Sequence, residues 1–562
     1  MHRKWLLSKT NADFIEYLSK GASVSPVLAQ ILVNRGIRDI KSIQTFISPP
    51  PSEMHDPFLM PDMQTAVSRL EHALKSGEKV LVHGDYDADG VTSTALLVSV
   101  FRKLGIETEY HIPHRDREGY GVSLLGVKKA QQLGAGLIVT VDCGISSHEE
   151  IAAAAALGID VIITDHHQPS EIMPEALAII NPHRHDSLYP FKRLAGVGVA
   201  LKLVQALKLH LKSEVLHIED YLDLAALGTV ADAVSLTGEN RAIAQAGIRE
   251  MNRTSPRPGI KALKEASGVQ NLIRSESLSF SMIPRINAAG RISDAAMVVE
   301  LLLTEDKNIA TRIALSLDQL NASRQEIEGK VFDSALAMIE REGAGHAIII
   351  ASSEWHAGVI GITASRLVEK FCRPVFIFSI KGTLAKGSAR SIPSVHLYDS
   401  LNACSSLLTR YGGHSQAAGI SLDMDHFEEF KSAINKVVHA GMKPDEMQPV
   451  LEIDASLRFA ELNYKLIKDI SRLEPFGEGN REPVFASKDV EMTAWKIVGS
   501  KHLKMDLMQK NVRMDSIGFS MGDKIETLET SSRFDIAYVP GINEWRGMKN
   551  IQLTMKGIRP GV

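Results

Sequence analysis

Residues 83–90 read His-Gly-Asp-Tyr-Asp-Ala-Asp-Gly, with three aspartates at alternate positions directly after the apolar stretch 79–82. A helix-forming run, residues 90–104, follows at once. A strand that ends in a polar turn and then a helix is the repeating element of α/β proteins. Carboxylates this close together repel one another unless a cation neutralises them. This stretch therefore predicts a strand end that faces a bound cation.

Two further polar clusters follow later apolar stretches. They are Val141-Asp142-Cys143-Gly144 and Thr164-Asp165-His166-His167. Open α/β sheets bind their ligands at the carboxyl ends of the parallel strands, so we expect all three clusters to meet there. Carboxylates and imidazoles together suit a hard divalent metal. We predict a metal site at this edge; three solvated acidic turns are the alternative interpretation.

These motifs resemble those of the DHH phosphoesterase superfamily, in which similar Asp-x-Asp and Asp-His-His sequences occur. Three later motifs narrow the resemblance to the RecJ family of single-strand-specific DNA exonucleases. They are Gly228-Thr-Val-Ala-Asp232, His356-Ala-Gly-Val-Ile-Gly361 and Gly412-Gly413-His414. The resemblance covers roughly residues 50–560, and its specificity comes from the order of the motifs.

The resemblance implies two divalent ions, Mn²⁺ or Mg²⁺, as cofactors. Asp142, at the centre of the predicted sheet edge, is the expected bridging ligand and hence a catalytic residue. By resemblance, Asp87, His166 and Asp232 join it on one ion, and Asp85 shares the other with it. Asp232 follows a predicted helix, so its spacing alone would fit any helix-terminal carboxylate.

Four residues beside these ligands have roles that the sequence leaves open. Many relatives carry a histidine where this chain has Leu81; His83 is either a replacement ligand or a strand-end histidine with satisfied hydrogen bonds. Asp89 either binds metal or caps the following helix, and we favour the cap. Asp165 is expected to orient an imidazole. By resemblance, His167 is catalytic and faces the scissile phosphate.

Two polar stretches suggest contacts with a nucleic acid. Residues 112–121 follow a predicted strand and contain Arg115 and Tyr120, which can bind a phosphate and stack on a base. Residues 284–291 set three polar side chains among small residues that permit close backbone approach: Arg285, Asn287 and Arg291. Solvated arginines in surface loops are the alternative for both stretches.

Two more polar stretches, residues 387–391 and 412–414, are predicted to form short turns in the second α/β unit. Hydroxyl, guanidinium and glycine amides are the groups that bind a terminal phosphate. The residues concerned, with the histidine of the motif at 356, are His356, Ser388, Arg390, Gly412, Gly413 and His414. The resemblance implies that this part of the chain holds the 5′ end of the strand. His414 as an ordinary turn histidine is the alternative.

The pattern along the chain predicts an α/β fold with several domains. Apolar stretches at 79–83, 107–112, 136–141, 160–164 and 176–180 alternate with helical stretches, which indicates a parallel sheet. One unbroken helix over 305–342, with Thr304 as its N-cap, would be about 55 Å long at 1.5 Å per residue. The predicted domains are 1–50 (helical), 51–304 (DHH), 305–342 (long helix), 343–445 (DHHA1) and 446–562 (β-barrel).

The region 446–562 is expected to form a small barrel of short strands, and the resemblance implies an oligonucleotide-binding (OB) fold. Its mixed aromatic and cationic residues are weak candidates for single-strand contacts: Trp495, Lys496, Trp545 and Arg546. Tryptophans in a barrel core between solvated cations are the alternative. Pro49, Pro50 and Pro51 predict a stiff connector after the N-terminal helices.

Composition excludes some classes of protein. The 562 residues include 63 Lys and Arg against 67 Asp and Glu, a net charge of −4, so there is no overall basic field for a polyanion. The three cysteines are too scattered for a disulfide framework or a cysteine zinc site. We find no signal peptide and no run of 18 apolar residues, and we expect a cytoplasmic protein without membrane contact.

The function that the sequence predicts is a metal-dependent 5′-to-3′ exonuclease that degrades single-stranded DNA to mononucleotides in recombination and repair. Polarity and DNA preference come from the resemblance, as do the expected partners, a single-strand-binding protein and a helicase. We expect a monomer. One alternative is a DHH phosphodiesterase acting on nanoRNA, cyclic dinucleotides or pyrophosphate. Another is a non-catalytic replication scaffold, which would be expected to lack some of the ligands.

Overall fold

The computed structural model describes residues 4–8, 11–49, 54–442, 450–499, 501–528, 531–545 and 547–561. Pro50 and Pro51 of the predicted connector, the domain boundary at 445/446 and Arg546 lie outside these ranges. The chain divides into two compact units. One consists mainly of Leu317–Leu451 with Arg291–Ser293, and the other of Trp5–Gly290, Asp294–Ser316 and the region from Glu452 onward.

A five-stranded parallel sheet carries the first three motifs. The strands are β2 (Val80–His83), β3 (Thr108–His111), β4 (Leu137–Val141), β5 (Asp160–Thr164) and β6 (Ala178–Ile180), in the order β3-β2-β4-β5-β6. Each neighbouring pair is parallel, which confirms the predicted sheet. The strand order reverses between β2 and β4, and α/β sheets bind ligands at such a switch point.

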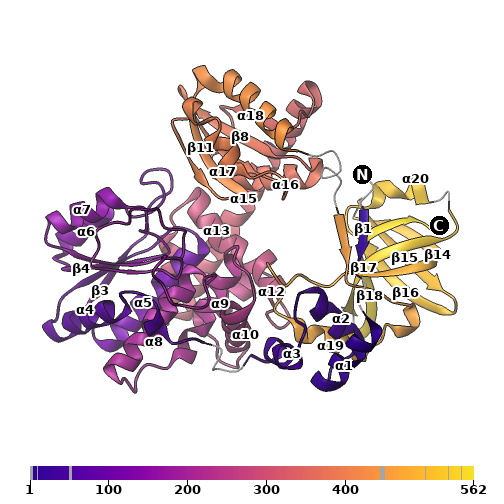
Figure 1. Ribbon diagram of the computed structural model, residues 1–562, viewed down its shortest axis with the longest axis horizontal. Coiled ribbons are helices and arrows are strands. Elements are labelled where there is room, and N and C mark those ends of the chain that lie inside the picture. The colour runs from indigo at the N-terminus through magenta and orange to yellow at the C-terminus, as the bar shows by residue number, and fades with distance from the viewer. Residues whose placement is uncertain are drawn as a thin grey trace. The chain divides into compact units, whose positions relative to one another are not determined.

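Helices cover both faces of this sheet (Figure 1). On one face lie α6 (Leu124–Leu133) and α7 (His148–Ala156), whose Val127 and Ile151 share a core with Leu81 and Ile138 of the strands. On the other lie α4 (Met63–Ser76), α5 (Ala88–Leu104) and α8 (Gly196–Leu211). Burial on both faces explains why the strands are continuous apolar runs without alternation.

A helical region follows the sheet. It comprises α9 (Leu222–Ala231), α10 (Gly238–Met251), α11 (Pro258–Ala266), α12 (Ser275–Ser277), a π-helical turn (Leu278–Met282), α13 (Ile283–Ile292) and α14 (Ala296–Leu303). The predicted long helix is α15 (Lys307–Glu342). The prediction that Thr304 is the N-cap of α15 was wrong. Asp306 Oδ1 accepts from the amides of Asn308 and Ile309, whereas Thr304 ends α14.

The second α/β unit has a mostly antiparallel sheet. Its elements are β7 (Ile348–Ser352), α16 (Ile360–Phe371), β8 (Val375–Lys381), β9 (Leu384–Arg390), α17 (Leu397–Asn402), β10 (Arg410–Gly413), β11 (Ala417–Asp423) and α18 (Phe427–Gly441), with strand order β10-β11-β9-β8-β7. The prediction of turns at 387–391 and 412–414 was wrong for most of these residues. Ser388 and Arg390 lie in β9, and Gly412 and Gly413 lie in β10.

The C-terminal region is a closed five-stranded barrel, as expected. Its strands are β14 (Phe485–Val498), β15 (His502–Gln509), β16 (Val512–Gly518), β17 (Phe534–Trp545) and β18 (Met548–Pro560). Hydrogen bonds between β14 and β17 close the barrel, and β16 pairs with β18 in parallel. Shorter elements of this region are β12 (Val450–Ile453), β13 (Ala455–Ser456), α19 (Tyr464–Ile470) and α20 (Ile525–Leu528).

The N-terminal helices pack against the barrel, far away in the sequence. After β1 (Lys4–Leu7) come α1 (Ala12–Ala22), α2 (Pro26–Asn34) and α3 (Ile40–Ile47). Buried Leu18 and Leu28 belong to one apolar core with Leu473 and Phe485. Asn11, Ser25 and Asp39 cap the three helices with their side chains. The first and last parts of the chain therefore share one hydrophobic core, although they are far apart in the sequence.

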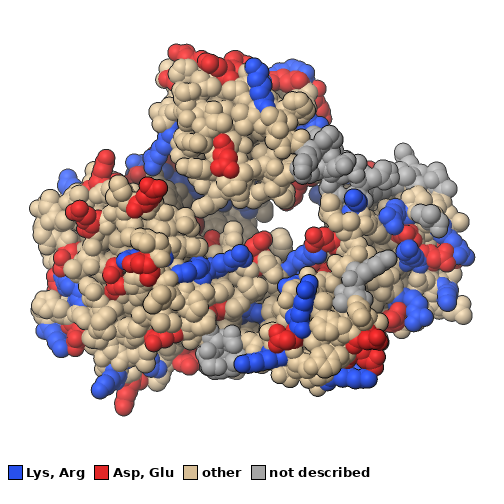
Figure 2. Space-filling model, in the orientation of Figure 1, with Lys and Arg blue, Asp and Glu red and all other residues tan. Residues whose placement is uncertain are grey.

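Among the described helices, none combines the length and apolar composition that a bilayer crossing requires. On the face shown in Figure 2, Lys and Arg side chains are interspersed with Asp and Glu. This agrees with the small net charge of −4.

Candidate metal centre

The Asp85–Gly90 turn supplies carboxylates from the end of β2 and the start of α5. Asp87 Oδ1 accepts from the amide of Gly90 at 3.0 Å and is the N-cap of α5. Asp89, in the first turn, accepts from the amides of Gly196 at 2.7 Å and Val197 at 2.8 Å. The prediction that Asp89 caps its own helix was wrong. Asp89 instead binds the N-terminus of α8. This contact fixes α8 against the Asp85–Gly90 turn, which we call the metal turn.

Asp142 follows β4 with a φ of 59°, in the left-handed region. Aspartate tolerates this conformation better than most residues do. Gly196 is what leaves room for it: a Cβ there would lie 2.5 Å from Asp142 Oδ1. Gly196 was missed at the level of the sequence, because it follows no strand and belongs to no predicted motif.

The two histidines after β5 are oriented by Asp165. Asp165 Oδ1 accepts from the amides of His166 and His167 and lies 2.7 Å from His167 Nδ1. Its Oδ2 accepts from the amide of Ile145 at 3.0 Å. The predicted orienting role of Asp165 agrees with these bonds. Burial lowers the His167 pKa, but the hydrogen bond with Asp165 and the charges of Asp165, Asp232 and Asp87 together outweigh burial and raise this pKa to about 9.

His166 brings the remaining groups together. Its Nε2 lies 3.1 Å from Asp142 Oδ1 and 3.6 Å from Asp232 Oδ2, and Asp232 ends α9. Ligand atoms of three groups of residues lie within 4.8 Å of one another: Asp85, Asp87 and Asp142; Asp142, His166 and His167; Asp89, His166 and Asp232. Asp142 belongs to two of these groups, as a bridging ligand would.

The buried carboxylates of this cluster repel one another, and a bound cation would neutralise them. Burial, and then the charge of Asp87, raises the pKa of Asp85 well above its usual range; burial and four neighbouring carboxylates do the same for Asp142. Three oxygens are buried and accept no hydrogen bond of good geometry from the described residues: Asp85 Oδ1, Asp142 Oδ1 and Asp232 Oδ2. The short distances from His166 Nε2 to two of them are ion-pair distances and not hydrogen bonds. Buried polar atoms normally have partners. Oxygen donors with one imidazole fit Mn²⁺ or Mg²⁺.

His83 is a structural residue. It is fully buried; its Nε2 accepts from the amide of Ser123 and its Nδ1 lies 3.1 Å from the carbonyl of Gly84. Burial lowers its pKa to about 3, so the ring is neutral. Since both nitrogens are engaged, His83 does not replace the missing histidine, and Leu81 lies in the core.

Residues predicted to contact nucleic acid surround this cluster. Tyr120 is 55% exposed, and its hydroxyl lies 3.1 Å from His167 Nε2. The Arg115 guanidinium carbon lies over the ring of Tyr86, 5.1 Å from the ring centroid. Asn287 has a structural contact, because its Oδ1 accepts from the amide of Ala88 in the metal turn at 2.9 Å.

Another residue that the sequence did not reveal is Asn181, which follows β6. It is buried, and its Nδ2 donates to the carbonyl of His167 at 2.8 Å. The strand-end position was a usable signal, since the three metal motifs also follow strands.

Arg285, another residue predicted to contact nucleic acid, lies on α13. Its Nη1 donates to the carbonyl of Ser281 at 2.6 Å.

In the second α/β unit, β9 and the start of α16 place several anion-binding groups together. A Cβ on Gly361 would lie 3.1 Å from Ser388 Oγ and 3.3 Å from an Arg390 nitrogen, so these side chains face the first turn of α16. Arg390 Nη1 also donates to Ser388 Oγ. His356 Nδ1 accepts from the amide of Gly358, in the loop before α16.

The β-sheet register aligns the other predicted residues of that unit. Gly412 pairs with Gly419, which pairs with Ser388, so the three lie in one row across β10, β11 and β9. A Cβ on Gly412 would meet no atom within 4 Å. His414 is exposed and follows β10; in the same unit, Arg291 Nη1 donates to the carbonyl of Gly358.

The barrel residues are only partly described. Trp495 is 42% exposed on β14, and Lys496 lies directly opposite Lys504 of β15. Like charges in such a pair are unfavourable unless an anion is near. Trp545 ends β17, but its side chain and all of Arg546 lie outside the described residues.

Comparison with known proteins identifies the family. The models of the DHH family N-terminal domain, the DHHA1 domain and the RecJ OB domain match residues 79–229, 344–440 and 453–557. The chain is 38% identical over 560 residues to the single-stranded-DNA-specific exonuclease RecJ of Bacillus subtilis (strain 168), covering 98% of this chain and 70% of that relative. It is 37% identical to the protein of the same name from Salmonella typhimurium (strain LT2), with all of both chains covered. The chain belongs to the RecJ family.

A solved structure supports the RecJ assignment. The crystal structure of RecJ in complex with Mn²⁺ from Thermus thermophilus matches with a TM-score of 0.86 and 30% identity, covering 100% of this chain and 80% of that one. The RecJ fold therefore extends over both compact units, including the barrel.

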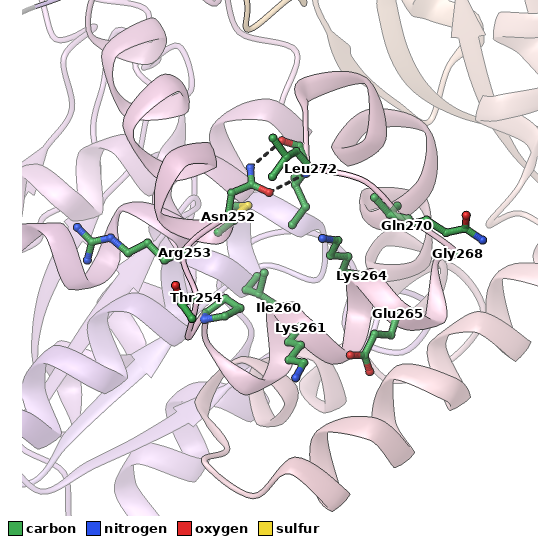
Figure 3. A pocket seen from close by; sticks show the side chains of 14 residues that line it. Asn252, Arg253, Thr254, Ile260, Lys261, Lys264, Glu265, Gly268, Gln270 and Leu272 are labelled. Carbon is green, nitrogen blue, oxygen red and sulfur yellow. Dashed lines mark hydrogen bonds between the residues drawn. The ribbon is translucent and has the colours of Figure 1, made fainter. Parts of the chain in front are cut away.

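One cavity of this RecJ-family chain lies away from the metal cluster. It has a volume of about 670 Å³ and is lined by α10, α11 and the segment after them, including Asn252, Ile260, Lys261, Lys264 and Leu272 (Figure 3). None of the residues that the sequence predicted for the site lines it.

We expect Mn²⁺ to stabilise this RecJ-family protein and Asp142→Asn to abolish most of that effect. A ligand at one hundred times its dissociation constant stabilises the folded state by about 2.7 kcal/mol, which is several degrees in melting temperature. Without metal, Asp142→Asn should melt at a higher temperature than the wild type, because a buried charge is removed. Thermal unfolding with and without Mn²⁺ measures both. Asp399→Asn, at a position 76% exposed, is the control. An undiminished Mn²⁺ response in Asp142→Asn would contradict the metal assignment.

We expect Gly196→Ala to lose most of its metal-dependent hydrolysis, because the added methyl displaces the Asp142 carboxylate. Gly329→Ala is the matched control. Gly329 lies in α15, and a Cβ added there would meet no atom within 4 Å. In a helix, alanine is more stable than glycine by about 0.5–1 kcal/mol. Turnover and Mn²⁺ affinity measure the difference. Equal turnover in the two variants would show that Asp142 does not depend on Gly196.

Proposed function

We propose that this protein is a metal-dependent exonuclease that hydrolyses single-stranded DNA from the 5′ end to mononucleotides, in recombination and repair. The observation that carries the proposal is the group of buried carboxylates around Asp142, with oxygens that lack partners among the described residues. Two further facts support it: the relatives that match the whole chain are named single-stranded-DNA-specific exonucleases, and the similar Thermus thermophilus structure holds Mn²⁺.

In this proposal, Asp142 is shared by two ions. Asp85 belongs to the first group with it. His166 lies 3.1 Å from Asp142 and 3.6 Å from Asp232, which supports a second group made of these three residues. The resemblance places Asp87 on the ion of His166 and Asp232, whereas its carboxylate groups with those of Asp85 and Asp142. Divalent ions at such a site neutralise the phosphate and activate the nucleophile.

His167 is proposed to act on the scissile phosphate. Asp165 fixes its Nδ1, so Nε2 is directed toward Tyr120 and away from the Asp165 carboxylate. The Asp165 carboxylate favours the protonated ring, in which Nε2 can donate a hydrogen bond to a phosphate oxygen. Tyr120 limits how this ring can rotate and offers its own hydroxyl to the same oxygen.

The strand is proposed to be held by cationic and polar groups around these residues. On the metal-binding unit these are Arg115, Tyr120 and Arg285, with Asn287 keeping the metal turn in place. Trp495, Lys496, Trp545 and Arg546 are proposed to contact the strand on the barrel. Arg291 is also proposed to contact the strand. The residues proposed to hold its 5′-terminal phosphate are His356, Ser388, Arg390, Gly412, Gly413 and His414. The cluster of Ser388 and Arg390 at the first turn of α16 supports this last role, because helix N-termini bind phosphate.

We further propose the domain division 1–50, 51–304, 305–342, 343–445 and 446–562. We also propose that the protein is cytoplasmic and acts as a monomer. Membership of the RecJ family supports a single-strand-binding protein and a helicase as its proposed partners.

A linear single strand should be degraded completely with Mn²⁺, whereas a covalently closed circle of the same sequence should resist. The physical reason is that cutting depends on capture of a 5′ end. Release of acid-soluble nucleotide from both substrates measures this, and Asp142→Ala controls for contaminating nucleases. Steady degradation of the circle would contradict an exonuclease mechanism.

Arg390→Ala should weaken binding of 5′-phosphorylated strands and leave 5′-hydroxyl strands nearly unaffected. A charge-assisted hydrogen bond contributes about 1.5–3 kcal/mol, or roughly ten- to a hundredfold in affinity. Binding without metal, so that no hydrolysis occurs, measures the effect. Arg341→Ala, at a position 72% exposed in the same unit, is the matched control. Equal losses for both kinds of 5′ end would exclude a terminal-phosphate contact.

A further inference from the structure

An exposed phenylalanine lies on the helical segment that leads to the metal turn. Phe280 is 80% exposed and lies in the π-helical turn Leu278–Met282. This turn connects α12 to α13, which are both labelled in Figure 1. Leu278 and Met282, on either side of it, are fully buried. Single exposed apolar residues are common and need no explanation in themselves. The surroundings of Phe280 distinguish it from the others.

Helix α13 connects Phe280 to the metal turn. Asn287 of this helix accepts from the amide of Ala88, and a Cβ on Gly290 would lie 2.1 Å from the carbonyl oxygen of Tyr86. The helix therefore packs directly on the backbone of the turn that carries Asp85 and Asp87. Phe280 precedes Asn287 by seven residues, roughly 10 Å along a helix.

The turn itself has two features of a binding surface. Single π-helical turns inside α-helices occur frequently at functional sites. Arg285, one turn onward, donates to the carbonyl of Ser281, which places a guanidinium beside the residue that follows Phe280. An aromatic face next to a cation is the combination that binds single-stranded nucleic acid, because bases stack and phosphates pair.

We infer that Phe280 is a stacking platform for a base of the single strand, a few nucleotides from the bond that is cut, with Arg285 beside the backbone phosphate. This inference rests on the proposed function and extends it to a residue outside the metal cluster. Stacking reads the plane of a base and not its edge, so the contact tolerates any sequence but requires a base to be present.

The test compares binding of two 5′-phosphorylated strands of equal length, one with all bases and one fully abasic, in the absence of metal. For the wild type, the strand with bases should bind more tightly. Phe280→Ala should weaken binding of that strand by roughly five- to a hundredfold and leave the abasic strand nearly unchanged. Phe280→Trp should restore the preference. Tyr17→Ala, at another exposed aromatic residue of the same unit, should behave as the wild type.

Two results would overturn the inference while leaving the proposed function intact. If the wild type degrades single strands but Phe280→Ala binds both strands as the wild type does, Phe280 serves another contact, such as one with a protein. If Phe280→Ala weakens both strands equally, its effect is on the fold and not on stacking. A wild type that neither binds nor degrades the strand with bases would overturn both proposals.

Discussion

The structure of the metal centre depends on one contact, between Asp142 in the left-handed conformation and Gly196 at the start of α8. Asp142 carries its carboxylate into the centre of the cluster only because residue 196 has no side chain. The amide of the same glycine donates to Asp89, so α8 is fixed to the turn that begins α5. Two strand ends and a helix that is distant in the sequence thus meet at one point, and the ligands of both proposed ions converge there.

Around that point the protein separates residues that would bind metal from residues that support them. Asp165, Asn181, Asn287 and Asp89 use their polar atoms on backbone amides and carbonyls or on His167. Asp85, Asp142 and Asp232 keep an oxygen without such a partner among the described residues. Burial makes charge on the Asp85 and Asp142 carboxylates unfavourable and raises the pKa of both groups, so the free energy of a bound cation offsets a cost that is built into the fold.

The two compact units contribute different chemistry. The parallel sheet places acidic groups and histidines at its carboxyl edge, where the strand order reverses. The second unit uses a mixed sheet and the first turn of α16 to bring a hydroxyl and a guanidinium to one place. Neither arrangement requires a basic surface over the whole molecule, which explains how a chain with a net charge of −4 can serve a polyanionic substrate.

Sequence alone determined the parallel sheet, the long helix and the barrel, because each depends on local patterns of apolar runs and helical spacing. Polar residues at strand ends also predicted a metal cluster at the sheet edge, whereas Asp232 became a candidate only through the family resemblance. It did not determine which carboxylate caps which helix, the structural role of His83, the strands at Ser388 and Gly412, or the importance of Gly196 and Asn181. It also could not show that α1–α3 share a core with the barrel. These features depend on which groups the folded chain brings within hydrogen-bond or van der Waals distance. A contact between Asp89 and Gly196, 107 residues apart, leaves no trace in local periodicity, and only the tertiary structure decides it.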